Sequence, residues 1–455
     1  MHNKASATSL DDLYPAHHAE LAARYESVLD ASPFEAIAIY SGAPRYRFRD
    51  DQAWPHRAGA FYQQWVPCED HAASVLLFRS GATPRLVLNL PRDYWHSVPA
   101  PPDGPWAGHF EIVIVDGPGA LRAALPHDLA ACALLGEPDD EVMAWGCAAL
   151  NPASLVTQLE FARLYKTAFE VECIAHANVA AARGHLAARA AFLGGAAEFG
   201  IHLAYLEATG HSEAELPYPN IIALNEHAAT LHYGRFDRRV PQPRLSFLID
   251  AGARCRGYAA DITRTWPAEP GGEFAALVEA LDHAQQALVE GLRVGASYLD
   301  VHEDAQLAVA VILEDFGIVT MAPDDMVAAG VSNVFLPHGV GHHLGLQVHD
   351  TGGKLRAPDG TPLPQPEAWP FLRNLRPLEQ GNVVTIEPGI YFIGSLLEKL
   401  RATPLARHVD WDAVERLAPY GGARIEDNVW MGPGGARNLS REAFAEVCRE
   451  AGARA

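Results

Sequence analysis

The feature that most constrains this chain is a set of acidic residues inside short apolar segments of its second half. Asp250 ends the run SFLID, Asp261 lies within GYAADITRTW, Glu387 follows VVTI, and Glu426 interrupts GARIEDNVW. Burying an ionised carboxylate without a partner is costly. Two carboxylates about 4 Å apart repel by about 4 kcal/mol at an effective dielectric constant of about 20. A fold that buries these segments must therefore supply compensating positive charge or leave the acids in solvent.

Each acid taken alone has an ordinary explanation. Asp261 follows Asp250 by eleven positions, and Gly252 and Gly257 lie between them, as in a hairpin. If the strands pair with the two aspartates opposite each other, both carboxylates face the same space, and a cation would relieve their repulsion. Otherwise the aspartates are solvated hairpin acids, and each glutamate is an edge or N-terminal capping residue.

A histidine-rich segment, residues 337–350, favours a metal site. It reads PHGVGHHLGLQVHD, with four histidines in twelve residues and three glycines among them. Glycine lets a backbone approach a site closely and adopt unusual dihedral angles. His342 and His349 are seven positions apart, so they need not bind the same metal.

Four carboxylates and at least one imidazole match two divalent cations, which would offset the four negative charges. A hydroxide bridging the cations would then be the natural nucleophile. Oxygen-rich ligation with one imidazole suits Mn²⁺ better than structural Zn²⁺, although catalytic Zn²⁺ or Co²⁺ remains an alternative.

Other catalytic signatures are incomplete. His302-Glu303 is followed by Gln306 where a zincin helix needs its second histidine. The segments at 295–297 and 330–332 lack the second glycine of a nucleophile elbow, so serine hydrolysis has no support. We find no P-loop and no complete dinucleotide fingerprint.

The length of 455 residues predicts two or more domains. In the first third, five apolar runs predict the strands of a sheet covered on both faces, at 36–40, 74–78, 85–90, 111–115 and 132–137. Nothing there clusters catalytic residue types, so this part is expected to be a scaffold or oligomerisation domain. We predict domains over 1–165 and 166–455.

The second domain is expected to begin with helices and continue with strands, which predicts an α+β architecture. Thr167 and Glu170 form a capping-box pattern that opens a helix ending at Gly194-Gly195. Further helices are predicted to about residue 209, over 273–292 and over 298–316. Strands are predicted in the segments NIIAL, ATLHY, LSFLIDAG, GYAADITRTW, NVVTIEPGIYF and GARIEDNVWM.

The net charge and the cysteines indicate which partners and which cellular compartment are expected for this protein. The formal net charge of −21 excludes phosphate-backbone binding, which relies on a basic surface. The six cysteines include no CxxC pair, which indicates reduced thiols and a cytoplasmic location. The N-terminal segment lacks the apolar core of a secretion signal, and no run of about 18 apolar residues predicts a membrane span.

The segments IDAGARCRGYAADITRT, PHGVGHHLGLQVHD, TIEPGIYF and RIEDN resemble, in order and spacing, those of the prolidases (Xaa-Pro dipeptidases). The likeness extends to bacterial proline dipeptidases and organophosphorus acid anhydrolases, and it covers nearly the whole chain. The resemblance implies a pita-bread catalytic domain after a smaller α/β creatinase-like N-terminal domain, and a homodimer. The implied reaction is hydrolysis of dipeptides with a C-terminal proline, with a side activity on organophosphate triesters.

The resemblance also implies roles for individual residues. Asp250 would bind one metal, Asp261 and Glu426 would bridge both, and His342 and Glu387 would complete the second. Glu387 would also shuttle protons.

Six further residues would contact the substrate or line its pocket. His232 and His338 would contact the scissile amide, and His349 and Arg424 would bind the substrate carboxylate. Tyr218 would line the pocket, and Asp51 would meet the substrate ammonium from the partner subunit.

Arg424 also has support from the strand pattern. Period-two alternation places Arg424, Glu426 and Asn428 on one face, and a guanidinium can bind a carboxylate with two hydrogen bonds. The choice of Asp51 over the adjacent Asp50 and the shape of the loop at Tyr218-Pro219 are less constrained. The alternative interpretations without a functional role are a solvated acid for Asp51 and a packing tyrosine for Tyr218.

Two enzyme alternatives share the same metal centre, namely an aminopeptidase P-like activity on longer peptides and phosphotriester hydrolysis. Two further uses of the fold, a metal-free binding module and a creatinase-like amidinohydrolase, lack the metal ligands. Because all five ligand positions are filled in this chain, both are disfavoured.

Overall fold

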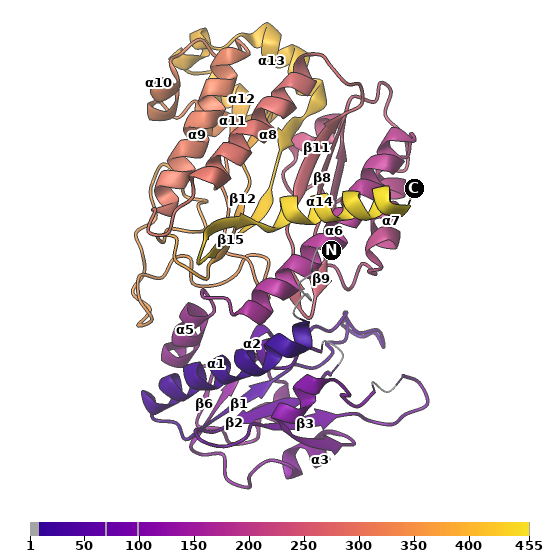
Figure 1. The fold of residues 1–455 in the computed structure, drawn as a ribbon, viewed down its shortest axis with the longest axis vertical. Helices are drawn as coiled ribbons and strands as arrows, with labels where there is room; N and C mark the ends of the chain where they lie inside the picture. The colour runs from indigo at the N-terminus through magenta and orange to yellow at the C-terminus, as the bar shows by residue number, and fades with distance from the viewer. Residues whose placement is uncertain (1–8, 69–70, 98–99, 455) are drawn as a thin grey trace, which may run out of the picture. The chain divides into compact units, whose positions relative to one another are not determined.

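The computed structural model describes residues 9–68, 71–97 and 100–454 (Figure 1). The chain forms two compact units, residues 1–173 with 357–361 and residues 174–356 with 362–455. The division at residues 165 and 166 stays a prediction about domain organisation. The sequence predicts that the N-terminal segment contains no secretion signal. Residues 1–8 of that segment lie outside the described residues. Within the described ranges, no helix is long and apolar enough to cross a membrane.

The N-terminal unit is built on a six-stranded mixed sheet with the strand order β4-β3-β2-β1-β5-β6. Antiparallel pairs join β2 to β1 and β3, and the other neighbours are parallel. The central strands are buried, which agrees with the apolar runs that predict them, and all five predicted strands are confirmed. The strands are β1 (Ala36–Tyr40), β2 (Val75–Phe78), β3 (Arg85–Asn89), β4 (Glu111–Val115), β5 (Cys132–Leu135) and β6 (Ala149–Leu150).

Short helices and one long helix accompany this sheet. Ser9 caps the long helix through a capping box with Asp12. The helices are α1 (Leu10–Asp30), α2 (Ala60–Trp65), η1 (Pro105–His109), α3 (Pro118–Ala123), α4 (Asp140–Met143) and α5 (Ala153–Ala162).

The boundary between the two units falls within the long helix α6, whose start the sequence predicts. The capping box forms, because Glu170 accepts from the Thr167 amide (2.8 Å) while Thr167 Oγ1 accepts from the Glu170 amide (3.4 Å). The helices of this part of the chain are α6 (Ala168–Leu193), α7 (Glu198–Thr209), α8 (Glu273–Gly291), α9 (Tyr298–Asp315), α10 (Pro323–Ala328), α11 (Ser332–Phe335), α12 (Gly394–Arg401), α13 (Trp411–Leu417) and α14 (Leu439–Arg454).

The strands of the larger unit form several small antiparallel sheets. The main ones have the orders β11-β8-β7 and β12-β15-β16, and a bridge between Thr263 and Glu426 connects them. The strands are β7 (Ile221–Leu224), β8 (Ser246–Asp250), β9 (Arg254–Cys255), β10 (Tyr258–Ala259), β11 (Thr263–Pro267), β12 (Val383–Ile386), β13 (Gly389–Tyr391), β14 (Gly422–Arg424), β15 (Asp427–Gly432) and β16 (Gly435–Asn438).

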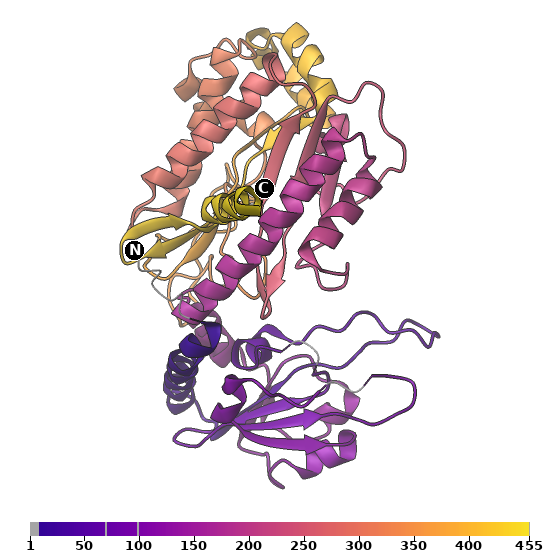
Figure 2. The ribbon, with the colours of Figure 1, turned by 45° about the vertical axis from the view of Figure 1, so that its right-hand side comes forward.

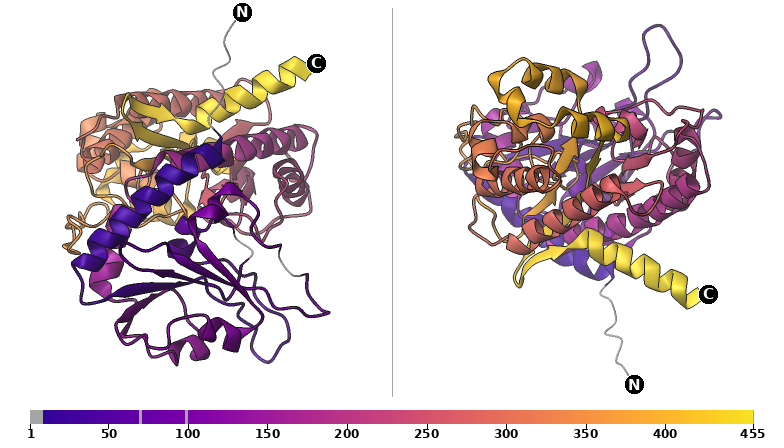
Figure 3. Two further views of the ribbon diagram at one scale, coloured as in Figure 1. Left: turned by 60° about the horizontal axis from the view of Figure 1, so that its bottom comes forward. Right: turned by 90° about the horizontal axis from the view of Figure 1, so that it is seen from above.

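Helices cover these strands from two sides, so the α+β architecture is confirmed. α8 and α9 lie side by side on one side, and α6 and α7 lie on the other (Figures 1 and 2). Two buried apolar clusters fill the layers: one joins α8 and α9 to β12 and β15, and the other joins α6 and α7 to β7 and β8. The C-terminal helix α14 packs on α6 through Ala443, Val447 and Ala182 (Figure 3).

The strand predicted for ATLHY, residues 229–233, is wrong. The chain leaves β7 at Asn225, whose φ of 55° is left-handed, and continues as the 3-10 helix η2 (Asn225–Ala229) and a turn. The Asn225 side chain holds this exit, because it accepts from the amides of Leu245 and Ser246 and donates to the Pro243 carbonyl. Local apolar alternation predicted a strand, but these longer-range hydrogen bonds favour a turn.

Candidate metal centre

The five predicted metal ligands line one cavity of about 480 Å³ in the larger unit. Each carboxylate lies where a strand ends or is interrupted. Asp250 is the last residue of β8, Asp261 separates β10 from β11, Glu387 separates β12 from β13, and Glu426 separates β14 from β15. The strand segments predicted around Asp261, Glu387 and Glu426 are therefore each interrupted at the proposed ligand. At these breaks the side chains of the four acids line the cavity instead of lying on the face of a continuous strand.

The two aspartates are not directly opposite. Asp250 pairs with Thr263 in the β8–β11 register, so Asp261 lies two positions away along the partner strand. Their carboxylates are nevertheless close, because the Tyr218 hydroxyl lies 2.7 Å from Asp250 Oδ1 and 2.5 Å from Asp261 Oδ1. A phenol has one proton, so it donates to one carboxylate at a time. Among the described residues, Tyr218 is not part of the cavity wall and instead lies behind both aspartates.

Asp261, His342 and Glu426 form the tightest group, with ligand atoms all within 4.8 Å of one another. His342 Nε2 lies 3.5 Å from Asp261 Oδ2 and 3.8 Å from Glu387 Oε1. His342 Nδ1 lies 2.9 Å from the His343 carbonyl oxygen, which can only accept a hydrogen bond. Nδ1 is therefore the protonated nitrogen when the ring is neutral, and the Nε2 lone pair faces the carboxylates.

Backbone contacts with β12 place His342. Its amide donates to Thr385 Oγ1, and the Thr385 amide donates to the His342 carbonyl. The preceding residue, Gly341, has a φ of 154°, and a Cβ there would collide with the Thr385 carbonyl and the Tyr298 hydroxyl. The glycine is thus required by the close approach of this loop to the strand.

The charges in the cavity call for a counter-charge. Burial raises the pKa of Glu387 to about 7 and the pKa of Asp250 above its usual value. Burial and the neighbouring carboxylates of Asp261 and Glu387 raise the pKa of Glu426 strongly. Burial acts in the same direction on Asp261, but hydrogen bonds from His342 and Tyr218 bring the pKa of Asp261 below its usual value. Such a cluster of buried oxygen ligands with one imidazole fits divalent cations.

Arg424 is buried at the edge of the cavity and is fully engaged. Its guanidinium donates to Asp250 Oδ2 (2.7 Å), the Tyr391 hydroxyl (2.8 Å) and Thr263 Oγ1 (3.0 Å). Arg373, an exposed residue of the same wall, makes no hydrogen bond or ion pair with another described residue. Sequence reasoning missed Arg373, because it lies in a loop that has no periodic pattern.

The three remaining predicted histidines also line the cavity. His338 joins a relay, since Arg424 donates to Tyr391, whose hydroxyl lies 2.8 Å from His338 Nε2. Burial and the Arg424 charge lower the pKa of His338 to about 3. His349 meets the His342 ring edge-on at 4.5 Å, and burial lowers its pKa to about 4. Sequence reasoning missed Tyr391, because it occurs within a strand, β13, and belongs to no catalytic motif.

Asp51 belongs to the N-terminal unit, where it is exposed. Its carboxylate accepts from Gln52 Nε2 at 3.2 Å. Tyr46, Phe48 and Trp54 in the same loop are also exposed, with Phe48 at 92 %.

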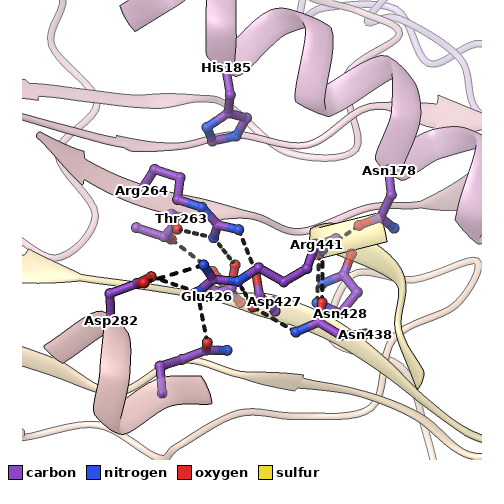
Figure 4. Close-up of polar contacts among 12 residues, drawn as sticks. Asn178, His185, Thr263, Arg264, Asp282, Glu426, Asp427, Asn428, Asn438 and Arg441 are labelled. Atoms are coloured by element: carbon purple, nitrogen blue, oxygen red, sulfur yellow. Dashed lines mark hydrogen bonds and ion pairs between the residues drawn. The ribbon is translucent and has the colours of Figure 1, made fainter. Parts of the chain in front are cut away.

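A polar network behind the cavity holds two of the buried carboxylates, Asp261 and Glu426. Figure 4 shows the part of this network around Glu426. Asn428 contacts both polar atoms of the Asp261 backbone: its Oδ1 accepts from the amide (3.0 Å) and its Nδ2 donates to the carbonyl (2.5 Å). Arg264 donates to the Glu426 carbonyl (2.7 Å) and to Asp427 Oδ1 (2.6 Å). The backbone on which each ligand sits is therefore fixed by side chains of other strands.

Asp427 is the charged centre of this network and is completely buried. It accepts from Arg264, Arg441 and Asn438. Although burial would raise the pKa of Asp427, the two arginines lower it to about 2. Arg441 continues the network to Asp282 of α8, so α14 and α8 are tied to β15, which begins directly after Glu426 (Figure 4).

Comparisons with known proteins agree with this arrangement. Residues 12–161 match the N-terminal domain of Xaa-Pro dipeptidase, and residues 172–433 match metallopeptidase family M24. The chain is 45 % identical over 437 residues to a Xaa-Pro dipeptidase of Xanthomonas campestris, covering 96 % of this chain and 99 % of the relative. It is 44 % identical to a Xaa-Pro dipeptidase of Stenotrophomonas maltophilia, covering 95 % and 97 %.

Solved structures show the same fold at low sequence identity. Aminopeptidase PepP of Pseudomonas aeruginosa superposes with a TM-score of 0.70 at 22 % identity, covering 94 % of this chain and 97 % of that one. Zinc-substituted aminopeptidase P of E. coli gives 0.69 at 20 % identity with the same coverage. The pita-bread catalytic fold after a smaller N-terminal domain is thereby confirmed. Together with the convergent ligands, these matches show that the chain belongs to metallopeptidase family M24 and, within it, to the Xaa-Pro dipeptidase (prolidase) family.

Proposed function

We propose that this enzyme hydrolyses dipeptides with proline in the second position, at a two-metal centre in the 480 Å³ cavity. The observation that carries the proposal is the convergence of five metal ligands and several cationic groups on one cavity wall. The names of the relatives at 44–45 % identity, which match over nearly their full length, support the substrate class.

The proposed ligands divide between two cations. Asp250 would hold one cation, His342 and Glu387 would hold the other, and Asp261 and Glu426 would be shared by both. Mn²⁺ is the proposed metal, with Co²⁺ or Zn²⁺ as alternatives. When bound, the cations act as Lewis acids that activate water and polarise the scissile carbonyl.

The chain's own residues perform the remaining tasks. Glu387 carries the proton and lies 3.7 Å from His338 Nδ1. His232 and His338 contact the scissile amide and stabilise charge developing on its oxygen, as preorganised polar groups do. Proline supplies no N–H to its amide bond, so a site that works on the carbonyl side is suited to this substrate.

The substrate carboxylate is bound by hydrogen-bond donors on the cavity wall. His349 and Arg424 are the predicted pair. Arg373 is a further candidate that the geometry supports, because its guanidinium is exposed at the cavity and lacks a partner among the described residues, whereas Arg424 already has three. A guanidinium without partners is available for a two-bond contact with a carboxylate.

Metal-dependent turnover of Ala-Pro tests the proposal. The purified enzyme is assayed as isolated, after removal of metal by a chelator, and after addition of Mn²⁺, Co²⁺ or Zn²⁺. We expect loss of hydrolysis on chelation and recovery with Mn²⁺. Absence of hydrolysis of every Xaa-Pro dipeptide under all metal conditions contradicts the proposal.

An aminopeptidase P-like activity is the second candidate, since the superposed solved structures are aminopeptidases P. Comparing Ala-Pro with Ala-Pro-Ala separates the two, because a carboxylate clamp rejects the tripeptide. A side activity on organophosphate triesters is tested with a phosphotriester in the same assay.

We also propose a cytoplasmic homodimer in which Asp51 meets the substrate ammonium in the partner's site. The exposed aromatic residues beside Asp51 support burial of this loop in an interface. The free cysteines support a reducing compartment. Light scattering measures the mass, and Asp51→Asn is expected to raise KM. A monomer with full activity contradicts this assembly.

A further inference from the structure

The segment that carries His232 is held by a buried carboxylate outside the metal centre. Glu198 is the first residue of α7 and only 1 % exposed, and it is not among the described residues that line the cavity. No arginine or lysine forms an ion pair with it among the described residues, so backbone and side-chain hydrogen-bond donors must stabilise its charge.

Each carboxylate oxygen of Glu198 accepts two hydrogen bonds, so the side chain accepts four in all. Oε1 accepts from the Leu224 amide (2.9 Å) and His227 Nδ1 (2.7 Å). Oε2 accepts from the Tyr233 hydroxyl (2.8 Å) and the Asp237 amide (2.7 Å). The donors come from both ends and the middle of residues 224–237. A single side chain therefore fixes the whole segment between β7 and the approach to β8.

The first turns of α7 add contacts to the same segment. The Phe199 amide donates to the Asp237 carbonyl at 3.1 Å, and the Phe199 ring lies 4.3 Å from the Arg238 guanidinium. His202 stacks on Phe236 with ring centroids 4.2 Å apart. These contacts hold the far end of the segment, while Glu198 holds its middle.

His232 lies directly before Tyr233, and the two have different environments. Tyr233 is buried on Glu198 and stacks on His227 at 4.5 Å. His232 is exposed and lines the cavity with Asp261 and Glu426. Among the described residues, no hydrogen bond, ion pair or ring contact restrains the His232 ring itself. Because its neighbour Tyr233 is anchored, the position of His232 depends on Glu198.

We propose that Glu198 is a positioning residue for the reaction: its four hydrogen bonds fix residues 224–237 so that His232 faces the reacting amide. The inference rests on the role proposed above for His232. A displacement of about 1 Å at such a group can lower turnover about a hundredfold.

Glu198→Gln tests the proposal, because the carboxamide keeps the shape but directs an N–H₂ group at two of the donors. We expect kcat for Ala-Pro with Mn²⁺ to fall about tenfold to a hundredfold, with metal content unchanged and KM changed less than kcat. Tyr233→Phe removes one of the four hydrogen bonds and keeps the ring, so a smaller loss is expected. Glu213→Gln is the matched control, because Glu213 bonds to His202 Nε2 from the exposed side and does not contact the segment donors.

A double-mutant cycle separates positioning from general destabilisation. If Glu198 acts through His232, adding Glu198→Gln to His232→Ala lowers kcat no further. If the two losses multiply, the positioning role is wrong. Should Glu198→Gln not fold, the same cycle with Tyr233→Phe decides the question.

Hydrogen exchange provides a readout independent of activity. Peptides covering residues 221–238 are expected to exchange faster in Glu198→Gln, while peptides from β8 and β15 are unchanged. Unchanged exchange over 221–238 overturns the inference even if turnover falls. Failure of the wild type to hydrolyse any Xaa-Pro dipeptide instead overturns the proposed function and leaves the anchoring of the segment to be judged by exchange.

Discussion

At the residue scale, the metal centre is a compromise between burial and charge. The acids proposed to bind metal are buried among other acids, which makes their ionised forms unfavourable when no cation is bound. The same burial strengthens their interaction with a cation, because water does not screen it. Selection for metal binding at these positions therefore lowers the stability of the metal-free protein.

This compromise predicts a pH effect in the metal-free enzyme. The folded-state pKa of Glu387 is raised from 4.5 to about 7, so the folded state binds more protons than the unfolded state between these values. Its contribution to stability is present below pH 4.5 and is lost as pH rises through 7, by up to about 3 kcal/mol. Glu387→Gln removes this loss.

The measurement is urea unfolding at several pH values. Buried histidines such as His185 and His302, whose pKa values burial lowers to about 3 and about 4, act in the opposite direction. The informative quantity is therefore the difference in unfolding free energy between wild type and Glu387→Gln. A difference that stays constant from pH 4.5 to 7 contradicts the prediction.

A second prediction at this scale concerns Gly341. An alanine there would adopt a strained φ of 154° and meet the Thr385 carbonyl. We expect Gly341→Ala to cost about 3 kcal/mol or more and to weaken metal binding by displacing His342. Gly394→Ala is the control, since it lies at the start of α12 with open space around it. Thermal unfolding and metal titration measure both effects, and equal behaviour of the two variants would sink the argument.

At the element scale, the ligands occur where strands break. The sequence pattern predicted strands through Asp261 and Glu426 and a turn at Pro388-Gly389 directly after Glu387, and in the structure the strands are interrupted at all three acids. Apolar periodicity reports which residues are buried, but it does not report where a backbone leaves its ladder, because the competing hydrogen bonds come from distant parts of the chain. ATLHY fails for the same reason, since Glu198 and Asn225 fix the backbone on both sides of that segment, at Leu224, Asp237 and Leu245.

The contact of Arg441 in α14 with Asp427 in β15 gives a prediction at the element scale. Arg441→Ala leaves buried Asp427 with Arg264 as its remaining cation and detaches α14 from α8. We expect a loss of about 2 kcal/mol in stability and weaker metal binding through the shifted Glu426 backbone. Arg401→Ala, which removes an exposed ion pair with Glu415 and a contact with the Trp411 ring, is the control and should change stability by about 1 kcal/mol or less. Urea unfolding and Mn²⁺ titration measure the two quantities; unaltered metal affinity in Arg441→Ala would argue against the coupling.

At the scale of the whole molecule, all five metal ligands lie in one compact unit and none in the other. A ligand that binds only the folded state stabilises it, by about 4 kcal/mol at a thousandfold excess over Kd. Calorimetry with and without Mn²⁺ is therefore expected to shift the unfolding of the larger unit upward and leave the N-terminal unit unchanged. Hydrogen exchange assigns the transitions, and an equal shift in both units would show that they unfold together.

The sequence alone determined the chemistry and much of the architecture. Acids inside apolar runs, a glycine-spaced histidine segment and helix capping signals are local or nearly local, so they could be interpreted without knowing distant contacts. The five proposed ligands were predicted from such signals, and the major helices and the sheet of the N-terminal unit follow from them. The resemblance added the roles of the remaining site residues.

Only the tertiary structure decided which groups surround those ligands and with what geometry. Tyr218 behind the aspartates, the engagement of Arg424, the availability of Arg373, the Asn428 contact with Asp261 and the anchoring of residues 224–237 by Glu198 all join residues far apart in the chain. Such contacts depend on register, strand breaks and close backbone approach. These arise from the free energy of the whole packed unit and leave no periodic trace in the sequence.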